Sequence, residues 1–474
     1  MHKYLRLALA TATATALAGG GLLTFSAVTA TAATVAPDDF NGDGYRDLAI
    51  GASNTDVGGR SAAGAVIVLY GSSSGVSAAR RTVITQNSSG VAGTAEQGDL
   101  FGTSLSPADF NRDGYADLAV GAEGESIGDR DAVGMVTILW GSSSGLKGGV
   151  TVPQPSTLSE YGGYSMDLAA ADFNGDGAAD LTVTGQSRTR LYLGPFKSDG
   201  TAASAGNVGM IGSTADVAAG DLNGDGAAER VYPFRTDADP GGHVWYYRWT
   251  GSSYAITDMT KADGDKGAVG DINGDGYGDL VLSQHQDPDE NYPVGHKGGQ
   301  LAIWYGGPAG PDLAQTPTVI HQDTAGVPGA GETYDRFGAT VSLGDINGDK
   351  FADVAVGAPG EDVGTKRDAG SVTVLYGSAS GLTTTGAKTY TQDTSGVPGA
   401  AETYDGFGGA VRLIDLNKNG RAELVVSAPD ENSRGAVWIL GGTSAGVTTT
   451  GAKSISALDV SLTTASNFGT ELAE

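Results

Sequence analysis

One short stretch carries the side chains best suited to chemistry. In Asp39–Asp47 (DFNGDGYRD), oxygen-bearing side chains stand at positions 1, 3, 5 and 9, and a glycine stands at position 6. Three of these side chains are carboxylates. Two like charges about 4 Å apart repel by roughly 4 kcal/mol at an effective dielectric constant of about 20, so a fold keeps this arrangement only around a cation. All-oxygen ligation suits a hard ion, and Ca²⁺ fits best because it accepts many oxygens in a flexible shell.

The same pattern recurs six more times along the chain. The further copies are Asp109–Asp117 (DFNRDGYAD), Asp172–Asp180 (DFNGDGAAD), Asp221–Glu229 (DLNGDGAAE), Asp271–Asp279 (DINGDGYGD), Asp345–Asp353 (DINGDKFAD) and Asp415–Glu423 (DLNKNGRAE). Successive copies start 70, 63, 49, 50, 74 and 70 residues apart, which is typical of a repeat architecture. They are not EF-hands, which need a glutamate at position 12; the residues there are Ile50, Val120, Val183, Tyr232, Leu282, Val356 and Val426.

Regular apolar runs follow each loop. In most copies, apolar residues at positions 10 and 12, as in Leu48-Ala49-Ile50, give the alternation of a half-buried strand directly after the loop. The next strands are expected at Ala65–Tyr70, Met135–Trp140, Arg190–Leu193, Val244–Trp249, Leu301–Tyr305, Ser371–Tyr376 and Ala436–Leu440. Strands are also expected before most loops, as at Phe101–Leu105, Phe337–Leu343 and Phe407–Leu413, and a weaker fourth strand at places such as Lys388–Gln392. We therefore predict an all-β fold, a seven-bladed β-propeller of four-stranded antiparallel blades.

The first blade has no strand before its loop, because only Thr34–Pro37 separates the loop from the N-terminal apolar segment. The missing sequence occurs at the other end of the chain, where Asn467–Leu472 (NFGTEL) matches the strand Phe101–Leu105 (FGTSL). We predict that this C-terminal strand pairs into the first blade and closes the ring, which removes both open edges.

These motifs resemble those of a known family. Phe337-Gly338, the loop Asp345–Asp353 and Gly357-Ala358-Pro359 are similar to the FG-GAP repeat of integrin α-subunit propellers and of related bacterial secreted proteins. The literal motif is patchy, since Gly51-Ala52-Ser53 and Gly121-Ala122-Glu123 lack the proline. The resemblance implies that each loop joins the first two strands of a blade and binds Ca²⁺. The implied ligands are the side chains at positions 1, 3, 5 and 9 and the carbonyl at position 7.

The implied ligand set covers all seven copies. It comprises Asp39, Asn41, Asp43, Tyr45, Asp47, Asp109, Asn111, Asp113, Tyr115, Asp117, Asp172, Asn174, Asp176, Ala178, Asp180, Asp221, Asn223, Asp225, Ala227, Glu229, Asp271, Asn273, Asp275, Tyr277, Asp279, Asp345, Asn347, Asp349, Phe351, Asp353, Asp415, Asn417, Asn419, Arg421 and Glu423. The copies are unequal. Lys350 replaces the glycine that usually supplies a positive φ, so we expect strain there. The copy at Asp415 has Asn419 beside Lys418, keeps two carboxylates and is expected to be the weakest of up to seven sites.

Composition excludes several classes of protein. The chain has 474 residues, no cysteine and a formal charge of −27, which argues against nucleic acid or an anionic membrane surface as partner. Residues 1–33 predict a secretory signal, with Lys3 and Arg6 before an apolar run and Ala30-Thr31-Ala32-Ala33 at its end. We expect residues 34–474 to form one propeller domain. We also expect the protein to be secreted, to have no stable membrane span and to be a monomer.

The longest loops fall on the rim opposite the metal loops. Connections between strands 2 and 3 include Gly51–Gly64, Gly121–Gly134, Ser283–Gly299 and Gly357–Gly370; connections between blades include His321–Asp335 and Thr391–Asp405. The repeats at Asp172 and Asp221 are trimmed on this side. We hypothesise that an extracellular protein or glycan docks on this rim, through Tyr334, Tyr404, His285 or Tyr292; ordinary exposed loop residues are the alternative.

Candidate catalytic groups are weak. Gly71–Gly75 and Gly141–Gly145 fit G-x-S-x-G, yet no helix is expected after them, and Gly377–Gly381 repeats the turn in another blade. The four histidines beyond the signal (His243, His285, His296 and His321) show no metal or triad spacing. We therefore expect a non-enzymatic adhesion or recognition module with structural Ca²⁺. A carbohydrate-binding lectin and an extracellular hydrolase or lyase are the alternatives.

Overall fold

The computed structural model describes residues 36–474 apart from 187, 210–215, 237–238, 289–293 and 465. The expected signal at residues 1–33 and the candidate rim residue Tyr292 lie outside the described residues. No helix among the described residues is long and apolar enough to cross a membrane.

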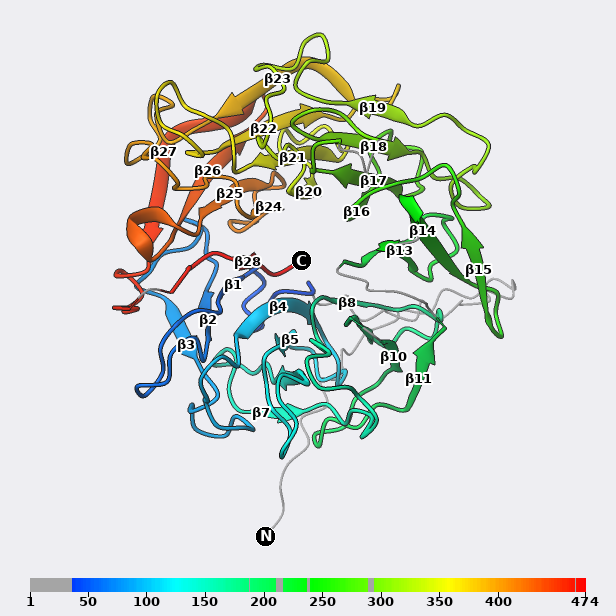
Figure 1. Cartoon of the computed structure of the whole chain (residues 1–474), viewed down its shortest axis with the longest axis vertical. Coiled ribbons are helices and arrows are strands. Elements are labelled where there is room, and N and C mark those ends of the chain that lie inside the picture. Colours follow the sequence, from blue (N-terminus) through cyan, green and yellow to red (C-terminus); the bar gives the residue numbers. More distant parts are fainter. Residues whose placement is uncertain (1–35, 187, 210–215, 237–238, 289–293, 465) are drawn as a thin grey trace, which may run out of the picture. The chain divides into compact units, whose positions relative to one another are not determined.

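Residues 36–474 form seven four-stranded antiparallel sheets arranged as a ring (Figure 1). The chain builds the blades in order, and each blade runs outward from the strand nearest the centre. Within the described residues, the one helical element is the short 3₁₀ turn η1 (Glu431–Ser433). The predicted all-β fold, a seven-bladed β-propeller of four-stranded antiparallel blades, is confirmed.

The strands lie close to their predicted places. Blades 1 to 4 contain, from the centre outward, β28 (Glu471–Leu472), β1 (Leu48–Ala52), β2 (Ala65–Leu69) and β3 (Arg81–Ile84); β4 (Phe101–Ala108), β5 (Asp117–Ala122), β6 (Met135–Leu139) and β7 (Gly149–Thr151); β8 (Leu168–Ala171), β9 (Asp180–Val183), β10 (Thr189–Leu193) and β11 (Ser204–Val208); β12 (Ala218–Gly220), β13 (Glu229–Thr236), β14 (Asp239–Trp249) and β15 (Tyr254–Asp258). Blades 5 to 7 contain β16 (Lys266–Gly270), β17 (Asp279–Gln284), β18 (Gln300–Trp304) and β19 (Thr318–Ile320); β20 (Thr340–Gly344), β21 (Asp353–Ala358), β22 (Ser371–Tyr376) and β23 (Thr383–Tyr390); β24 (Val411–Ile414), β25 (Glu423–Ala428), β26 (Ala436–Thr443) and β27 (Gly446–Ser456).

The strand after each metal loop is more deeply buried than its alternation predicts. Every residue of β1, β5, β9, β17, β21 and β25 is buried, so the expectation of half-buried strands is wrong. The reason is face-to-face packing of the blades. Leu48 and Ile50 of β1 pack with blade 7, whereas Ala49 between them packs with blade 2. The alternation therefore separates large from small apolar side chains instead of apolar from polar ones.

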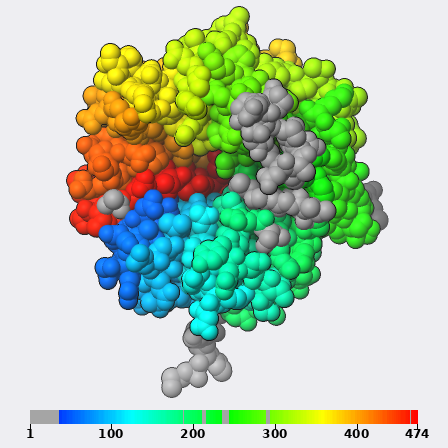
Figure 2. Space-filling view, viewed as in Figure 1, coloured from blue at the N-terminus to red at the C-terminus, as the bar shows by residue number. Residues whose placement is uncertain are grey.

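The two ends of the chain meet in blade 1, as predicted. β28 pairs antiparallel with β1, with Leu472 opposite Ile50 and Glu471 opposite Gly51. The backbone N–H groups of Gly469 and Ala473 extend this pairing by donating to the carbonyls of Gly51 (2.9 Å) and Ala49 (3.1 Å). Figure 2 shows the red C-terminal segment beside the blue first blade. Phe468, fully buried, anchors the segment in the core shared with blade 7.

We predict that this closure stabilises the whole ring. Phe468→Ala removes a fully buried ring and should cost about 3–5 kcal/mol of unfolding free energy. Deletion of residues 467–474 should cost at least as much, because it exposes the edge of β1. Thermal or urea unfolding measures both effects. Leu458→Ala, at a largely exposed position, is the control, and a truncated chain that melts like the full chain would contradict closure.

Candidate metal centres

The seven acidic loops lie on one rim of the ring, which we call the metal rim. Each loop enters the second strand of its blade, as Asp109–Asp117 joins β4 to β5. The loops are also joined to one another. In five of the loops the N–H at position 8 donates to the position 1 carbonyl of the preceding loop: Ala116 to Asp39, Ala228 to Asp172, Gly278 to Asp221, Ala352 to Asp271 and Ala422 to Asp345, at 2.7–3.1 Å. The metal rim is therefore a hydrogen-bonded belt that runs from blade to blade.

Inside each loop, side-chain oxygens accept the loop's own N–H groups. In the first loop, Asp39 accepts from the N–H groups of Asp43 (3.1 Å) and Gly44 (2.8 Å). Asn41 Oδ1 accepts from Asp43 N–H at 2.8 Å, and Asp43 Oδ1 accepts from Tyr45 N–H at 3.1 Å. The loop at Asp271 repeats these bonds at positions 1, 3 and 5. These bonds fold the sequence into a tight turn closed by its own side chains.

The position 9 acid is buried and held at both oxygens. Asp47 Oδ2 accepts from Phe40 N–H (3.0 Å), and Oδ1 accepts from Gly71 N–H (2.8 Å) just after β2. All five aspartates at this position follow the same scheme. The partner after the third strand must be glycine, since a Cβ on Gly71 would lie 2.1 Å from the Arg46 carbonyl oxygen. This carboxylate thus links the start of the loop, the start of the second strand and the end of the third strand.

Burial makes the charge on this acid costly. Burial, together with the charges at positions 1 and 5, raises the pKa of Asp47 and Asp117 to about 8. The pKa of Asp180 and Asp353 rises to about 7 for the same reasons, and that of Asp279 to about 6. A cation beside these oxygens reverses the penalty because it favours the charged form. The donor set, all oxygen and rich in carboxylate, fits a hard ion such as Ca²⁺.

The two loops that end in glutamate are built differently. The longer side chains of Glu229 and Glu423 turn one oxygen to the side-chain amide of the position 3 asparagine, Asn223 and Asn417. Their other oxygen keeps the bond to the position 2 N–H. The Lys453 ammonium lowers the pKa of Glu423, which burial raises to about 7. A nearby cation and only two carboxylates make the loop at Asp415 the poorest of the seven for an ion.

Other loop positions support the packing. All seven position 2 side chains are apolar and fully buried: Phe40, Phe110, Phe173, Leu222, Ile272, Ile346 and Leu416. Lys350 adopts φ 75°, so the expected strain is present. Arg112 and Lys418 share this left-handed geometry at position 4.

Sequence reasoning missed one role of position 7. The Tyr115 ring covers Gly42 of the preceding loop, where a Cβ would meet it at 2.7 Å; Phe351 covers Gly274 at 2.6 Å.

The carboxylates of an acidic loop are not the most tightly grouped candidate metal ligands in the described residues. Among the described residues, one group of three His, Cys, Asp or Glu side chains has ligand atoms all within 4.8 Å of one another, and it is His296, His321 and Asp323. The three acids of a loop are spaced more widely, with their oxygens on loop N–H groups. The histidines show no metal spacing in the sequence, but the fold places two of them beside Asp323. His296 lies 25 and 27 residues before His321 and Asp323, and only the fold brings it to them.

The opposite rim, which we call the loop rim, carries the long connections. It is shortened at blade 3, where β9 and β10 are separated by residues 184–188 only, whereas residues 53–64 separate β1 and β2. Connections between blades bind the neighbouring 2–3 loops, as Gln86 Nε2 donates to Glu125 Oε2 (2.6 Å) and Gln392 Nε2 to Glu431 Oε2 (2.7 Å). The uneven rim expected from the sequence is confirmed for the described residues.

Three tyrosines project from the loop rim. Tyr161, Tyr334 and Tyr404 are 64%, 70% and 52% exposed, and all have positive φ, between 53° and 76°. Their N–H groups donate to the 2–3 loops, at the carbonyls of Asp131 (3.0 Å) and Arg367 (2.8 Å) and at Asp287 Oδ2 (2.8 Å). Tyr334 borders a hollow of about 510 Å³ with His285. Sequence reasoning missed Tyr161, whose surroundings (SEYGG) differ from the two nearly identical loops around Tyr334 and Tyr404.

The G-x-S-x-G stretches form turns between the third and fourth strands. Ser72 Oγ donates to the Gly75 carbonyl at 2.7 Å, and Ser142 and Ser378 repeat this bond to Gly145 (2.8 Å) and Gly381 (2.7 Å). No helix follows these turns within the described residues. These stretches are therefore Ser/Gly turns, as the sequence indicates, and the motif position held by Ser73 and Ser143 is Ala379 in the third copy.

Family models match much of this repeat pattern. A model described as the FG-GAP repeat matches residues 31–69, 101–139, 337–375 and 407–440, and one described as an FG-GAP-like repeat matches residues 172–232. These ranges contain six of the seven loops; the loop at Asp271 lies outside them.

Similar proteins include phospholipases D and integrin alpha chains by name. The chain is 26% identical over 403 residues to phosphatidylinositol-glycan-specific phospholipase D of Rattus norvegicus, covering 83% of this chain and 42% of that protein. It is 30% identical over 268 residues to integrin alpha-PS2 of Drosophila melanogaster, covering 55% of this chain and 15% of that protein. The chain thus spans less than half the length of these relatives.

A solved structure, described as an Agrocybe aegerita lectin that recognises non-reducing terminal N-acetylglucosamine, has a TM-score of 0.48 and 14% identity, covering 86% of this chain and 89% of that one.

The repeat models, the seven equivalent loops and the closed ring agree on the family. The chain is an FG-GAP repeat protein, and its seven-bladed propeller is of the kind found in integrin α-subunits.

Proposed function

We propose that this chain is a secreted binding module in which Ca²⁺ on the metal rim stabilises the ring and the loop rim contacts an extracellular protein or glycan. One observation carries the proposal. Three exposed tyrosines, each with a strained backbone, are fixed by hydrogen bonds on the rim that holds no acidic loop. Strain of this kind costs about 1–3 kcal/mol per residue and concentrates at ligand-binding sites.

Calcium supports this function from the other rim. The position 1, 3, 5 and 9 side chains and the position 7 carbonyl are the proposed ligands in each loop. The ion would place a positive charge beside the buried position 9 carboxylate and so stabilise its charged form. The hydrogen bonds between successive loops would extend this stabilisation from one blade to the next. Catalysis is not part of the proposal, because no helix follows the turns of Ser73 and Ser143 in the described residues and the equivalent position in blade 6 is Ala379.

The loop rim offers its ligand an aromatic surface that can also form hydrogen bonds. Tyrosine offers a large apolar face with a hydroxyl and low entropy cost on binding. Sugars and polar protein surfaces both fit it. Relatives named as integrin alpha chains support a protein ligand, and a lectin function is the second candidate, because Tyr161 Oη (3.2 Å from Asp131 Oδ2) and Asp131 place a hydroxyl and a carboxylate together on the rim.

Removing Ca²⁺ should destabilise the ring strongly. Extracellular Ca²⁺ modules bind with Kd of about 10⁻⁴–10⁻³ M, so about 10 mM Ca²⁺ should add roughly 1–3 kcal/mol per occupied site. Calorimetric melts in 10 mM Ca²⁺ and in EDTA test this, and equal melting temperatures would remove the metal role.

Two matched variants test the loops as the sites. Asp113→Asn removes a carboxylate from a complete loop, and Asn419→Asp supplies the one missing from the weakest loop. We expect the first to lower and the second to raise the Ca²⁺-dependent gain in melting temperature, with both folding normally. Unchanged gains in both would show that Ca²⁺ acts elsewhere.

Without metal, stability should fall as pH rises. The position 9 acids have folded-state pKa values of about 6–8, above those of ordinary carboxyls. Their protonated form is therefore favoured by folding, so stability is full below about pH 4 and is lost as pH rises through 6 to 8. Melts in EDTA at pH 5 and pH 8.5, in about 0.5 M NaCl to screen surface charge, should differ far more than melts in Ca²⁺. A flat profile in EDTA would contradict the buried-charge account.

The rim tyrosines should decide ligand binding without affecting the fold. A glycan and matrix-protein array in Ca²⁺ identifies the ligand, and Tyr161→Ser, Tyr334→Ser and Tyr404→Ser should each weaken binding about tenfold or more at hot-spot positions. Melting temperatures should stay unchanged because the side chains are exposed. Ile256→Ser, half exposed on the outer strand β15, is the control. Affinity unchanged in all three tyrosine variants would overturn the rim assignment.

A further inference from the structure

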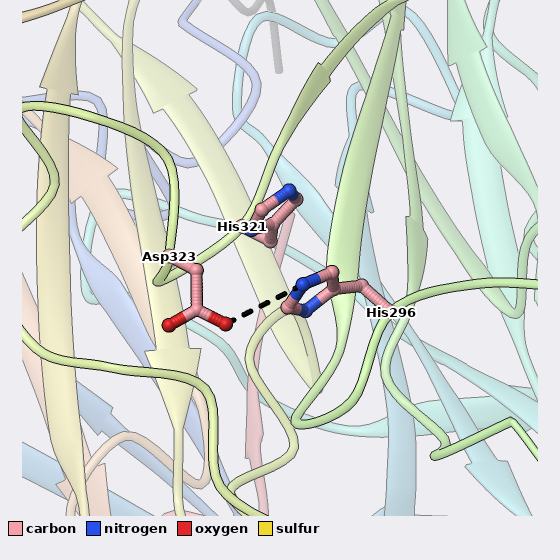
Figure 3. A group of neighbouring side chains, drawn as sticks. All are labelled: His296, His321 and Asp323. Atoms are coloured by element: carbon pink, nitrogen blue, oxygen red, sulfur yellow. Dashed lines mark ion pairs between the residues drawn. The ribbon is translucent and has the colours of Figure 1, made fainter.

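The loop rim of blade 5 holds a group of metal-ligating side chains that differs from the acidic loops. His296 lies in the connection between β17 and β18, and His321 and Asp323 follow β19. One ligand atom of each lies within 4.8 Å of the others. Figure 3 shows the His321 ring above the His296 ring, with the Asp323 carboxylate directed at His296. The two rings stack with centroids 3.6 Å apart and planes 7° apart.

The hydrogen bond at Nδ1 of His296 leaves Nε2 of the neutral ring as an acceptor. Nδ1 lies 2.8 Å from the Lys297 carbonyl oxygen, which can only accept, so Nδ1 carries the proton. In the neutral ring Nε2 then holds a lone pair, and it lies 3.4 Å from Asp323 Oδ2. A lone pair and a carboxylate oxygen at this distance are compatible with a metal ion between them, and the alternative is a second proton on His296 Nε2, which makes an ion pair. A backbone carbonyl on the far nitrogen is also the usual support of a metal-binding histidine.

Neighbouring contacts orient the other two side chains. The Gly331 N–H donates to Asp323 Oδ1 at 3.0 Å, which leaves Oδ2 toward His296. Nδ1 of His321 is buried and has no hydrogen-bond partner in the described part of the chain.

The chain contains an internal comparison for this site. The loop after β23 repeats the sequence, with Thr391 in place of His321 and Asp393 in place of Asp323. Asp393 Oδ1 accepts from Ala401 N–H at 3.0 Å, as Asp323 accepts from Gly331. Its Oδ2, however, pairs with the Lys366 ammonium at 2.7 Å. The equivalent carboxylate in blade 6 thus has a fixed cation, whereas in blade 5 two imidazoles occupy that place.

From this arrangement we infer that His296 Nε2, His321 and Asp323 Oδ2 bind a borderline divalent transition-metal ion, with Zn²⁺ as the best fit. Two imidazoles and one carboxylate suit Zn²⁺, whereas the all-oxygen loops suit Ca²⁺. Tetrahedral Zn²⁺ at about 2.0–2.1 Å from its ligands sets them about 3.3 Å apart, so the three side chains close inward on binding. The ion then ties the 2–3 loop of blade 5 to the connection into blade 6 and leaves a coordination position for water or a partner's ligand.

Titration of the purified full chain without a polyhistidine tag tests the site. With about 10 mM Ca²⁺ present throughout, Zn²⁺ added in a calorimeter should bind with one tight equivalent per chain, and Co²⁺ should give the intense visible absorption of a tetrahedral site. Zn²⁺ binding that disappears in Ca²⁺ would place the ion in the acidic loops and overturn the proposal.

Variants copied from blade 6 keep the experiment interpretable. His321→Thr reproduces Thr391, and His296→Lys supplies an ammonium for Asp323 as Lys366 does for Asp393. Both should fold with the parent's melting temperature in Ca²⁺, and Zn²⁺ affinity should fall at least tenfold in the first and vanish in the second. Asp323→Asn should also weaken Zn²⁺ at least tenfold, and Lys366→Ala should leave it unchanged. Parent-like Zn²⁺ affinity in the two histidine variants would show that the group is only a His296–Asp323 ion pair.

Discussion

The buried carboxylate at position 9 of each acidic loop is the constraint on which the rest of the structure depends. It accepts the N–H of the buried position 2 residue and, in five loops, the N–H of the glycine after the third strand. One side chain therefore fixes the turn, the anchor below it and the neighbouring hairpin. The same burial penalises its charge, so a cation beside the loop strengthens the geometry that the hydrogen bonds set up.

Repetition converts this local constraint into a property of the ring. Five loops bind the preceding loop through backbone hydrogen bonds, and position 7 side chains such as Tyr115 and Phe351 cover glycines of the loop before them. An ion that orders one loop thus acts on the next blade. With the metal rim held in this way, the opposite rim is free to vary in length and in side chains. In the proposed function, this division separates stability from recognition.

Much of the fold could be predicted because the repeat is periodic. The seven copies fix the number of blades, and the match between Asn467–Leu472 and Phe101–Leu105 indicates how the ring closes. Burial of β1 on both faces could not be seen, because Leu48, Ala49 and Ile50 show only an alternation of size, and a strand between two blades has no polar face. The likeness of the loops at His321 and Thr391 was visible in sequence, but their partners His296 and Lys366 come from other loops. A site formed by two separate connections can be identified only once the fold is known, whereas a site within nine consecutive residues can be predicted from the sequence.

The number of Ca²⁺ ions held by each chain tests the account most directly. The purified chain is dialysed against about 5 mM Ca²⁺, and the bound metal is measured by elemental analysis against the dialysis buffer. Five loops keep aspartate at position 9 together with acids at positions 1 and 5, so the account predicts at least five Ca²⁺ per chain and at most seven. One ion or none would contradict it.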